Sequence, residues 1–279
     1  MAFWTNAPHG GNIGYIAVLE SGTAFPSAMR ALILSDIHAN IDALEAVLDA
    51  APAYDVVWNL GDMVGYGAGP NAVVERVRAL GNVFVRGNHD RACCGLTDAE
   101  EFNSVALRAV HWTQRELTKD NKDWLRKVPR GPVLPDGPQV GCVHGSPLDE
   151  DHYVLSLRDA LQQLALARTR LTFFGHTHVQ GGFATNRDGD RFELRPTYSS
   201  GDGADCYQLD LRETASYLLN PGSVGQPRDH DWRAAFAIYD DVAQRVTFWR
   251  VPYPVRVAQA RIQRAGLPDV LATRLFTGR

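Results

Sequence analysis

Five short segments of the chain carry residue types that bind transition metals in proteins. Each segment follows an apolar stretch, and together they contain Asp36 and His38, Asp62, Asn88 and His89, His144, and His176 and His178. Carboxylate and imidazole ligands together suit Mn, Fe, Zn, Ni or Co. The lack of cysteine among them argues against a structural zinc site, and the imidazoles argue against calcium. The residue types therefore predict a catalytic centre containing transition metals.

The spacing within the segments suggests how two ions are shared. Asp36 and His38 are two residues apart, as are His176 and His178, and side chains at this spacing point the same way in an extended chain. One aspartate can bridge two ions through its two oxygens. Two ions about 3.5–4 Å apart can hold both the attacking and the leaving oxygen of a phosphoryl displacement. The pattern is therefore compatible with chemistry at a phosphoryl group.

Such a centre requires a fold that brings distant strand ends together. Apolar runs at residues 31–34, 55–58, 82–85, 139–143 and 171–174 predict buried strands, each followed by one of the five segments. Helical patterns lie between them, at residues 40–48, 70–80, 101–117 and 156–167. Ligands gather at the carboxyl ends of strands in open α/β sheets, so we expect the five segments to meet in one crevice.

The second half of the chain has a different pattern. Strands are expected around six aromatic or aliphatic residues, which are Phe183, Phe192, Tyr207, Tyr217, Phe236 and Val246. A final helix is expected at residues 255–265. The whole pattern predicts an α/β fold, a four-layer αββα sandwich of two facing mixed β-sheets with helices outside. We expect residues 29–279 to form this one domain. Residues 1–28, rich in Gly, Ser, Pro and Asn, are expected to be a disordered or non-native N-terminal extension.

Composition limits the partners and the compartment. The net charge of −4 over 279 residues argues against a nucleic acid polymer as partner. No apolar run is long enough to cross a bilayer. The four cysteines fit no zinc motif, and the adjacent Cys93 and Cys94 would form an awkward disulfide, which predicts a reducing, cytoplasmic location. A homo-oligomer is compatible with the sequence.

The order of the five segments resembles a known family. The series Asp36-x-His38, Gly61-Asp62, Gly87-Asn88-His89-Asp90, Val143-His144-Gly145 and Gly175-His176-Thr177-His178 is similar to the motif blocks of the calcineurin-like metallophosphoesterase superfamily. All five blocks occur in order at fitting spacings. The later stretch Asn220-Pro221-Gly222-Ser223-Val224-Gly225 resembles the small prokaryotic phosphodiesterase branch of that superfamily.

The resemblance implies a ligand set for two ions, with manganese the expected metal and iron, zinc, nickel or cobalt as alternatives. It assigns one ion to Asp36, His38 and His178, the other to Asn88, His144 and His176, and a bridging role to Asp62. Every position of the family's ligand set is filled here by a competent residue.

Roles beyond the metals follow in the same way. The resemblance implies that His89 binds phosphate with Asn88 and acts as general acid, and that Asp90 orients its ring. Two further residues are candidates from the sequence alone. Arg228 could pair with a phosphate through its guanidinium, although a surface arginine is an equally simple interpretation. Tyr66, in a glycine-rich loop, could face the substrate.

The predicted activity is hydrolysis of phosphodiester bonds in a small substrate by attack of a metal-bridging hydroxide. The alternative is a phosphomonoesterase or protein phosphatase on the same site, because the ligand set does not distinguish diesters from monoesters. A scaffold that has lost catalysis is disfavoured because the ligands and the general acid are intact. A nuclease is disfavoured by the acidic balance of charge.

Overall fold

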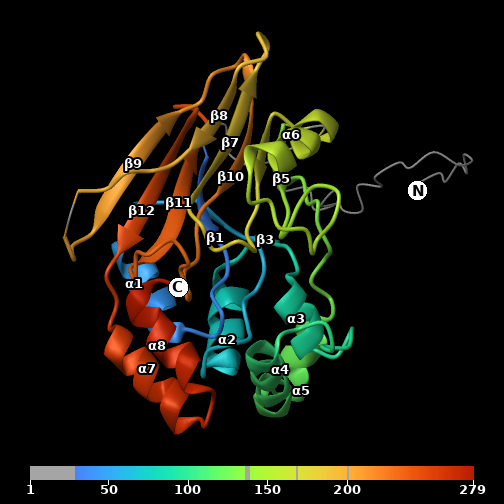
Figure 1. Ribbon diagram of the computed structural model, residues 1–279, viewed down its shortest axis with the longest axis vertical. Helices are drawn as coiled ribbons and strands as arrows, with labels where there is room; N and C mark the ends of the chain where they lie inside the picture. The colour runs from blue at the N-terminus through green and yellow to red at the C-terminus, as the bar shows by residue number, and fades with distance from the viewer. Residues whose placement is uncertain (1–28, 136–138, 168, 200) are drawn as a thin grey trace, which may run out of the picture.

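The computed structural model describes residues 29–135, 139–167, 169–199 and 201–279, and its elements follow in chain order (Figure 1). The strands are β1 (Arg30–Leu34), β2 (Val56–Asn59), β3 (Val83–Phe84), β5 (Val140–Cys142), β6 (Leu171–Phe173), β7 (Gly181–Asn186), β8 (Arg191–Leu194), β9 (Asp205–Asp210), β10 (Ala215–Asn220), β11 (Ala234–Asp240) and β12 (Arg245–Val251). The helices are α1 (Ile41–Ala50), α2 (Pro70–Leu80), α3 (Asn88–Cys93), α4 (Ser104–Glu116), α5 (Lys119–Leu125), α6 (Leu157–Leu166), α7 (Val255–Arg264) and α8 (Asp269–Thr277).

The strands form two facing mixed sheets. Within the described residues, one sheet has the order β3-β2-β1-β11-β12-β9 and the other the order β5-β6-β10-β7-β8. Strands β1, β2 and β3 run parallel, as do β5, β6 and β10, whereas β11, β12, β7 and β8 pair antiparallel. Helices α1, α2, α7 and α8 lie together at one end of the view, while α6 lies beside β5 and β10 (Figure 1). The predicted αββα sandwich is confirmed.

The alternation of side chains along β1 shows how the layers are held together. Ala31 and Ile33 belong to the core between the sheets, where Trp58 of one sheet meets Phe173 of the other at 6.2 Å between ring centroids. Leu32 and Leu34 face the helices instead. Successive residues of a strand point to opposite faces, so one short apolar run supplies two cores.

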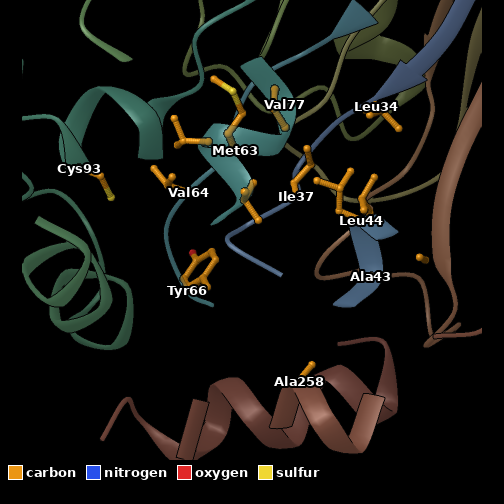
Figure 2. Close-up of a cluster of buried hydrophobic side chains, with 14 of the residues drawn as sticks. Leu34, Ile37, Ala43, Leu44, Met63, Val64, Tyr66, Val77, Cys93 and Ala258 are labelled. Atoms are coloured by element: carbon orange, nitrogen blue, oxygen red, sulfur yellow. The ribbon is translucent and has the colours of Figure 1, made fainter. Parts of the chain in front are cut away.

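The core beneath the helices also contains the loop that follows β2. Figure 2 shows Leu34 and Leu44 in this core together with Met63, Val64 and Tyr66 of that loop. Of these, Met63 and Val64 are fully buried and Tyr66 is 7% exposed. The loop is therefore anchored by hydrophobic packing, although it follows directly on a predicted metal ligand.

Several local predictions are confirmed. Asn40 caps α1, its side chain accepting a hydrogen bond from the Ala43 amide at 3.2 Å. Helix α2 spans the predicted residues and begins at Pro70. All six strands expected in the second half are present, as β7 to β12.

Other boundaries were predicted wrongly. The helix expected at residues 255–265 is present as α7, but a further helix, α8, follows it after Gly266, which is left-handed, and Pro268. Helix α4 begins at residue 104 rather than 101, because the Asn103 side chain caps it. Two short helices, α3 and α5, were not predicted. They are too short for an amphipathic period to show in the sequence.

Residues 1–28 lie outside the described residues, so their expected dispensability stays a prediction. Met29 is buried, and its backbone nitrogen donates to Asp241 Oδ1. None of the helices in the described part of the chain is long and apolar enough to cross a membrane.

Candidate metal centre

The metal-ligating residues predicted from the sequence lie in loops that follow strands of both sheets. Three of these strands, β1, β2 and β3, belong to one sheet, and β5 and β6 belong to the other. The ligand atoms of Asp36, His38, Asp62 and His178 lie within 4.8 Å of one another, and so do those of Asp62, His144 and His176. All six residues are buried. Because Asp62 belongs to both groups, the geometry is that of two adjacent cation sites sharing one carboxylate.

The backbone of these loops is not extended, contrary to the prediction from the two-residue spacing. Left-handed conformations, with φ between 48° and 67°, occur at Asp36, His38, Asp62, His176 and His178. Such conformations cost non-glycine residues of the order of 1–3 kcal/mol and persist only where the surroundings impose them. Here the backbone nitrogens of Asp36 and His38 donate to the carbonyls of Gly61 and Asp62 at 3.0 and 2.9 Å. The two loops therefore hold each other in the strained conformation.

Backbone carbonyls fix the orientation of three imidazoles. The Nδ1 atoms of His38, His144 and His178 lie 3.1, 2.8 and 2.6 Å from the carbonyl oxygens of Val64, Leu60 and Gln226, respectively. An Nδ1–H that donates to a carbonyl leaves the Nε2 lone pair free for a metal. The Nε2 atoms of His38 and His178 are only 3.1 Å apart. Two neutral nitrogens facing each other so closely suit a shared cation.

The two remaining predicted ligands are His176, through a ring nitrogen, and Asn88, through its amide oxygen. His176 Nε2 lies 3.1 Å from the Asp151 carbonyl, which leaves Nδ1 for the ion. The amide oxygen of Asn88 lies 3.2 Å from His144 Nε2. Asn88 begins helix α3 instead of ending an extended strand. The structure thus places Asn88 beside the second group, as the sequence predicts.

The two oxygens of Asp62 have different surroundings. Its Oδ1 accepts a hydrogen bond from the backbone nitrogen of His89 at 2.8 Å. Its Oδ2 lies 3.6 Å from His38 Nε2 and 3.4 Å from His144 Nε2. A Cβ on Gly87 would lie 2.1 Å from Oδ1, so only glycine fits there. Oδ1 thus has a backbone donor as partner, while Oδ2 faces the imidazoles of both groups.

The electrostatics of the cluster favour cations. Burial raises the pKa of Asp36 to about 7, and the Asp62 charge also raises it while His144 lowers it. Burial would also lower the pKa of His144, but Asp62 and Asp36 outweigh this and raise it to about 10. Burial holds the pKa of His38 well below its usual range. Two carboxylates and several imidazoles lie together away from water, and their protonation states depend on one another. Divalent ions would be coordinated by all of these groups without any of them being protonated. The donor set therefore fits two metal ions.

His89 lies beside the cluster and is held by packing. Its ring centroid is 4.4 Å from that of Tyr66 and 4.8 Å from that of Phe102. A Cβ on Gly65 would lie 2.5 Å from His89 Nδ1. This Nδ1 is buried without a hydrogen-bond partner among the described residues. Aromatic contacts and the close approach of Gly65 thus fix the position of the His89 ring.

Asp90 does not make the contact expected of it. Its two oxygens accept hydrogen bonds from the backbone nitrogens of Val64 and Gly87 at 3.1 and 3.0 Å. Within the described residues no hydrogen bond links its carboxylate to the His89 ring. The prediction that Asp90 orients this ring is therefore replaced by a role in tying the loop after β2 to the start of α3.

The two tentative substrate-binding residues both lie at the centre. The Tyr66 ring centroid is 4.6 Å from that of His38. The Arg228 guanidinium carbon lies 5.7 Å from the Tyr66 ring centroid, and the Arg228 backbone nitrogen donates to the His178 carbonyl. Sequence reasoning left Arg228 open between a surface role and a phosphate contact. The structure places it half-buried against the metal-binding segment.

Sequence reasoning missed two contacts. Tyr153 stacks on the His176 ring at 3.7 Å between centroids and is 45% exposed, and no local pattern marks it. Asn220 donates to the Gly175 carbonyl and to Thr177 Oγ1, at 2.8 and 3.0 Å, which secures the turn between the two histidines. Asn220 begins the Asn-Pro-Gly stretch, so the motif was visible although its structural role was not.

A cavity of about 780 Å³ opens beside the centre. Its wall includes Thr177, which lies between two predicted ligands, and Arg228. The β7–β8 hairpin and residues 228–233 form much of the remainder. Its charged groups are largely paired, as in Arg233 with Asp231. The cavity therefore provides a large polar space next to the predicted ions.

This fold and buried Asp/His cluster define a metallophosphoesterase. The chain belongs to the calcineurin-like phosphoesterase superfamily, whose domain matches residues 29–242. It is 32% identical to an uncharacterized protein of Methanocaldococcus jannaschii over 88% of this chain and 97% of that protein. A symmetrical bis(5′-nucleosyl)-tetraphosphatase of Sodalis glossinidius is 30% identical over 36% of this chain and 38% of that enzyme.

Two solved structures extend the comparison. A metallophosphoesterase from Sphaerobacter thermophilus is 42% identical, with a TM-score of 0.77, covering 91% of this chain and all of that one. A hypothetical protein from Pyrococcus horikoshii OT3 has a TM-score of 0.69 at 19% identity, covering 90% of this chain and 98% of that one, which shows the shared fold. The recognition made from the five motif blocks is confirmed.

Proposed function

We propose that this protein hydrolyses phosphodiester bonds in a small substrate, using two metal ions, with manganese preferred. The cavity beside the centre is the observation that carries this choice. A monoester has one organic arm, while a diester has two and needs room for the second. Thr177, which lies between the predicted ligands His176 and His178, and Arg228 line one part of a space of about 780 Å³. That space can receive the second ester arm.

The protein's residues have separate tasks in this proposal. Asp36, His38 and His178 would hold one ion, Asn88, His144 and His176 would hold the other, and Asp62 would be shared by both. Two such ions lower the pKa of a bound water to about 7 and neutralise charge on the phosphoryl oxygens. Strained loops and carbonyl-anchored imidazoles keep this ligand geometry fixed, so little reorganisation is needed during the reaction.

His89 contacts the substrate rather than a metal in this proposal. Burial lowers the pKa of His89 to about 4, against the raising influence of Asp62. A neutral imidazole can still donate its N–H to a phosphoryl oxygen, and the incoming phosphate charge favours protonation. His89 therefore binds phosphate and delivers a proton to the leaving oxygen, and Arg228 adds positive charge on the same side.

The cellular setting in the proposal is the reducing cytoplasm. Cys93, Cys94 and Cys142 are buried free thiols. Burial raises the pKa of Cys142 and keeps its thiol protonated and inert. Free buried cysteines persist most easily where thiols stay reduced.

Activity against paired substrates tests the proposal. The purified protein is loaded separately with Mn, Ni, Co, Fe, Zn or Mg and given bis(p-nitrophenyl) phosphate or p-nitrophenyl phosphate. We expect a higher kcat/KM for the diester, with Mn the best metal. Arg256→Gln, which changes an exposed arginine on α7, is the control for a substitution far from the centre and should show the same substrate preference. A preference for the monoester would favour the alternative, a phosphomonoesterase or protein phosphatase.

A further inference from the structure

Two arginines near the centre share one neutral partner. Arg228 Nη2 donates to Gln226 Oε1 at 3.1 Å, and Arg274 Nη1 donates to the same oxygen at 3.4 Å. Arg274 lies on α8, after the region matched by the superfamily domain. Its Nε is buried without a hydrogen-bond partner among the described residues. One amide oxygen cannot satisfy two guanidinium groups, each with five donors.

Neither arginine forms an ion pair with a carboxylate among the described residues. Burial lowers the pKa of Arg274, and the charge of Arg228 lowers it further. Two positive charges held close together without a carboxylate partner are unfavourable unless an anion binds between them. Their arrangement therefore indicates an anion-binding site.

The absence of a carboxylate partner in the described part of the chain contrasts with the pairing of two neighbouring arginines. Arg250 and Arg233, which also line the cavity, are buried, and each is paired with an aspartate, Asp229 and Asp231. The chain therefore neutralises its other buried arginines at this site and leaves the Arg228–Arg274 pair uncompensated. Because the whole protein carries a net charge of −4, the pair does not reflect a generally basic surface.

The pair is rigidly connected to the metal centre. Gln226 is 2% exposed, its carbonyl oxygen accepts from His178 Nδ1, and its side chain holds both arginines. One aromatic ring, Tyr66, lies between the Arg228 guanidinium and the rings of His38 and His89. An anion at the pair would thus lie one side chain away from the reacting phosphorus.

We infer that Arg228 and Arg274 form a second anion subsite, which binds a further phosphate group on the same substrate. The inference rests on the proposed function and narrows it to phosphodiesters that carry a second phosphate. Planar guanidinium groups bind phosphate oxygens through paired N–H donors. A phosphate bound there would accept hydrogen bonds from donors of both arginines that Gln226 leaves free.

A matched pair of substrates tests this directly. Thymidine 5′-(p-nitrophenyl phosphate) and its 3′-phosphorylated form have the same leaving group and differ by one phosphate. With the Mn-loaded protein we expect a higher kcat/KM for the 3′-phosphorylated form. Arg274→Gln should reduce that preference roughly 10- to 100-fold, the scale of charge-assisted hydrogen bonds. Arg256→Gln, an exposed arginine on α7, should keep it.

Binding measured by calorimetry separates this inference from the proposed function. The Mn-loaded protein is titrated with AMP and ADP, and with thymidine 5′-monophosphate and thymidine 3′,5′-bisphosphate. Tighter binding of the ligand with two phosphates in either pair, lost in Arg274→Gln, supports the subsite even if no ester is hydrolysed. Equal binding within both pairs overturns it, even if diesters are hydrolysed. An equal loss for one- and two-phosphate substrates in Arg274→Gln also overturns it, since Arg274 would then act on the reacting phosphate.

Discussion

The metal centre and the group of side chains beside it, Tyr153, Arg228 and Arg274, are built in opposite ways. The metal-ligating histidines are buried and oriented by backbone carbonyls, such as those of Leu60 and Val64. Tyr153, Arg228 and Arg274 are at least partly exposed and make mainly side-chain contacts. One region is fixed by the backbone of five loops, and the other is assembled from separate parts of the chain.

This difference separates chemistry from substrate choice. Backbone anchoring tolerates little change, because each metal ligand must keep its angle and distance. Tyr153, Arg228 and Arg274 come from the loop before α6, the loop before β11, and α8, which lies beyond the matched superfamily domain. Such segments can vary while the ions stay in place, so relatives can share the reaction and differ in substrate.

The largest expected effect is at the shared carboxylate. Asp62→Ala should reduce diesterase activity to background, further than any single histidine change, because Asp62 belongs to both ligand groups. Loss of a residue that merely supports a ligand typically costs about 10–100-fold, and a shared ligand should cost more. Metal content by mass spectrometry checks the cause, with Asp188→Ala in an exposed turn as control. Two retained ions and a mild rate loss would remove Asp62 from the bridging position.

The second largest effect is expected at His89, the residue proposed to contact the substrate. His89→Ala should retain both ions and lower kcat by about 10²–10⁴-fold, the usual range for general acid catalysis. The loss should be smallest for p-nitrophenyl esters and largest for dialkyl esters, because an alkoxide needs the proton most. Rates across esters of graded leaving-group pKa measure this. A uniform loss would indicate phosphate binding alone, and a lost ion would mean that His89 is misplaced.

A smaller effect is expected where a side chain supports the histidine turn. Asn220→Ala removes the donors to the Gly175 carbonyl and Thr177 Oγ1. Leaving these buried acceptors unpaired should cost about 1–3 kcal/mol of stability, and metal affinity should fall about 10–100-fold. Thermal unfolding and metal titration measure both. Asn186→Ala, at the β7–β8 turn, should leave metal affinity unchanged, and unchanged metal affinity in Asn220→Ala would contradict the supporting role.

The smallest expected effect lies at the N-terminus. A chain beginning at Met29 should keep the fold and the activity of the full sequence, because β1 begins at Arg30 and the superfamily match begins at residue 29. Its new amino group can still donate to Asp241 Oδ1. Circular dichroism and diesterase assays compare the two chains. Loss of bound metal in the shorter chain would show that residues 1–28 contribute to the centre.

Short-range patterns in the sequence were enough to predict the layers and the Asp and His residues that gather in two clusters. An apolar run such as residues 31–34 identifies a buried strand, and a polar residue directly after it lies at the strand's carboxyl end. Parallel pairing then brings these ends together, as β1, β2 and β3 show. Asp36, Asp62 and His176 were therefore predictable, because the covalent chain and the strand direction together determine where they lie.

Tertiary structure decided everything that depends on packing between distant segments. The left-handed loops, the hydrogen bond between the His89 backbone and Asp62, and the partners of Asp90 arise from contacts between loops that no local pattern specifies. Arg274 meets Arg228 only because α8 folds back against the centre, 46 residues along the chain. Sequence determined which chemistry the chain can perform. The fold alone decided which unpaired charges lie beside it, because charge compensation depends on distances that sequence spacing does not set.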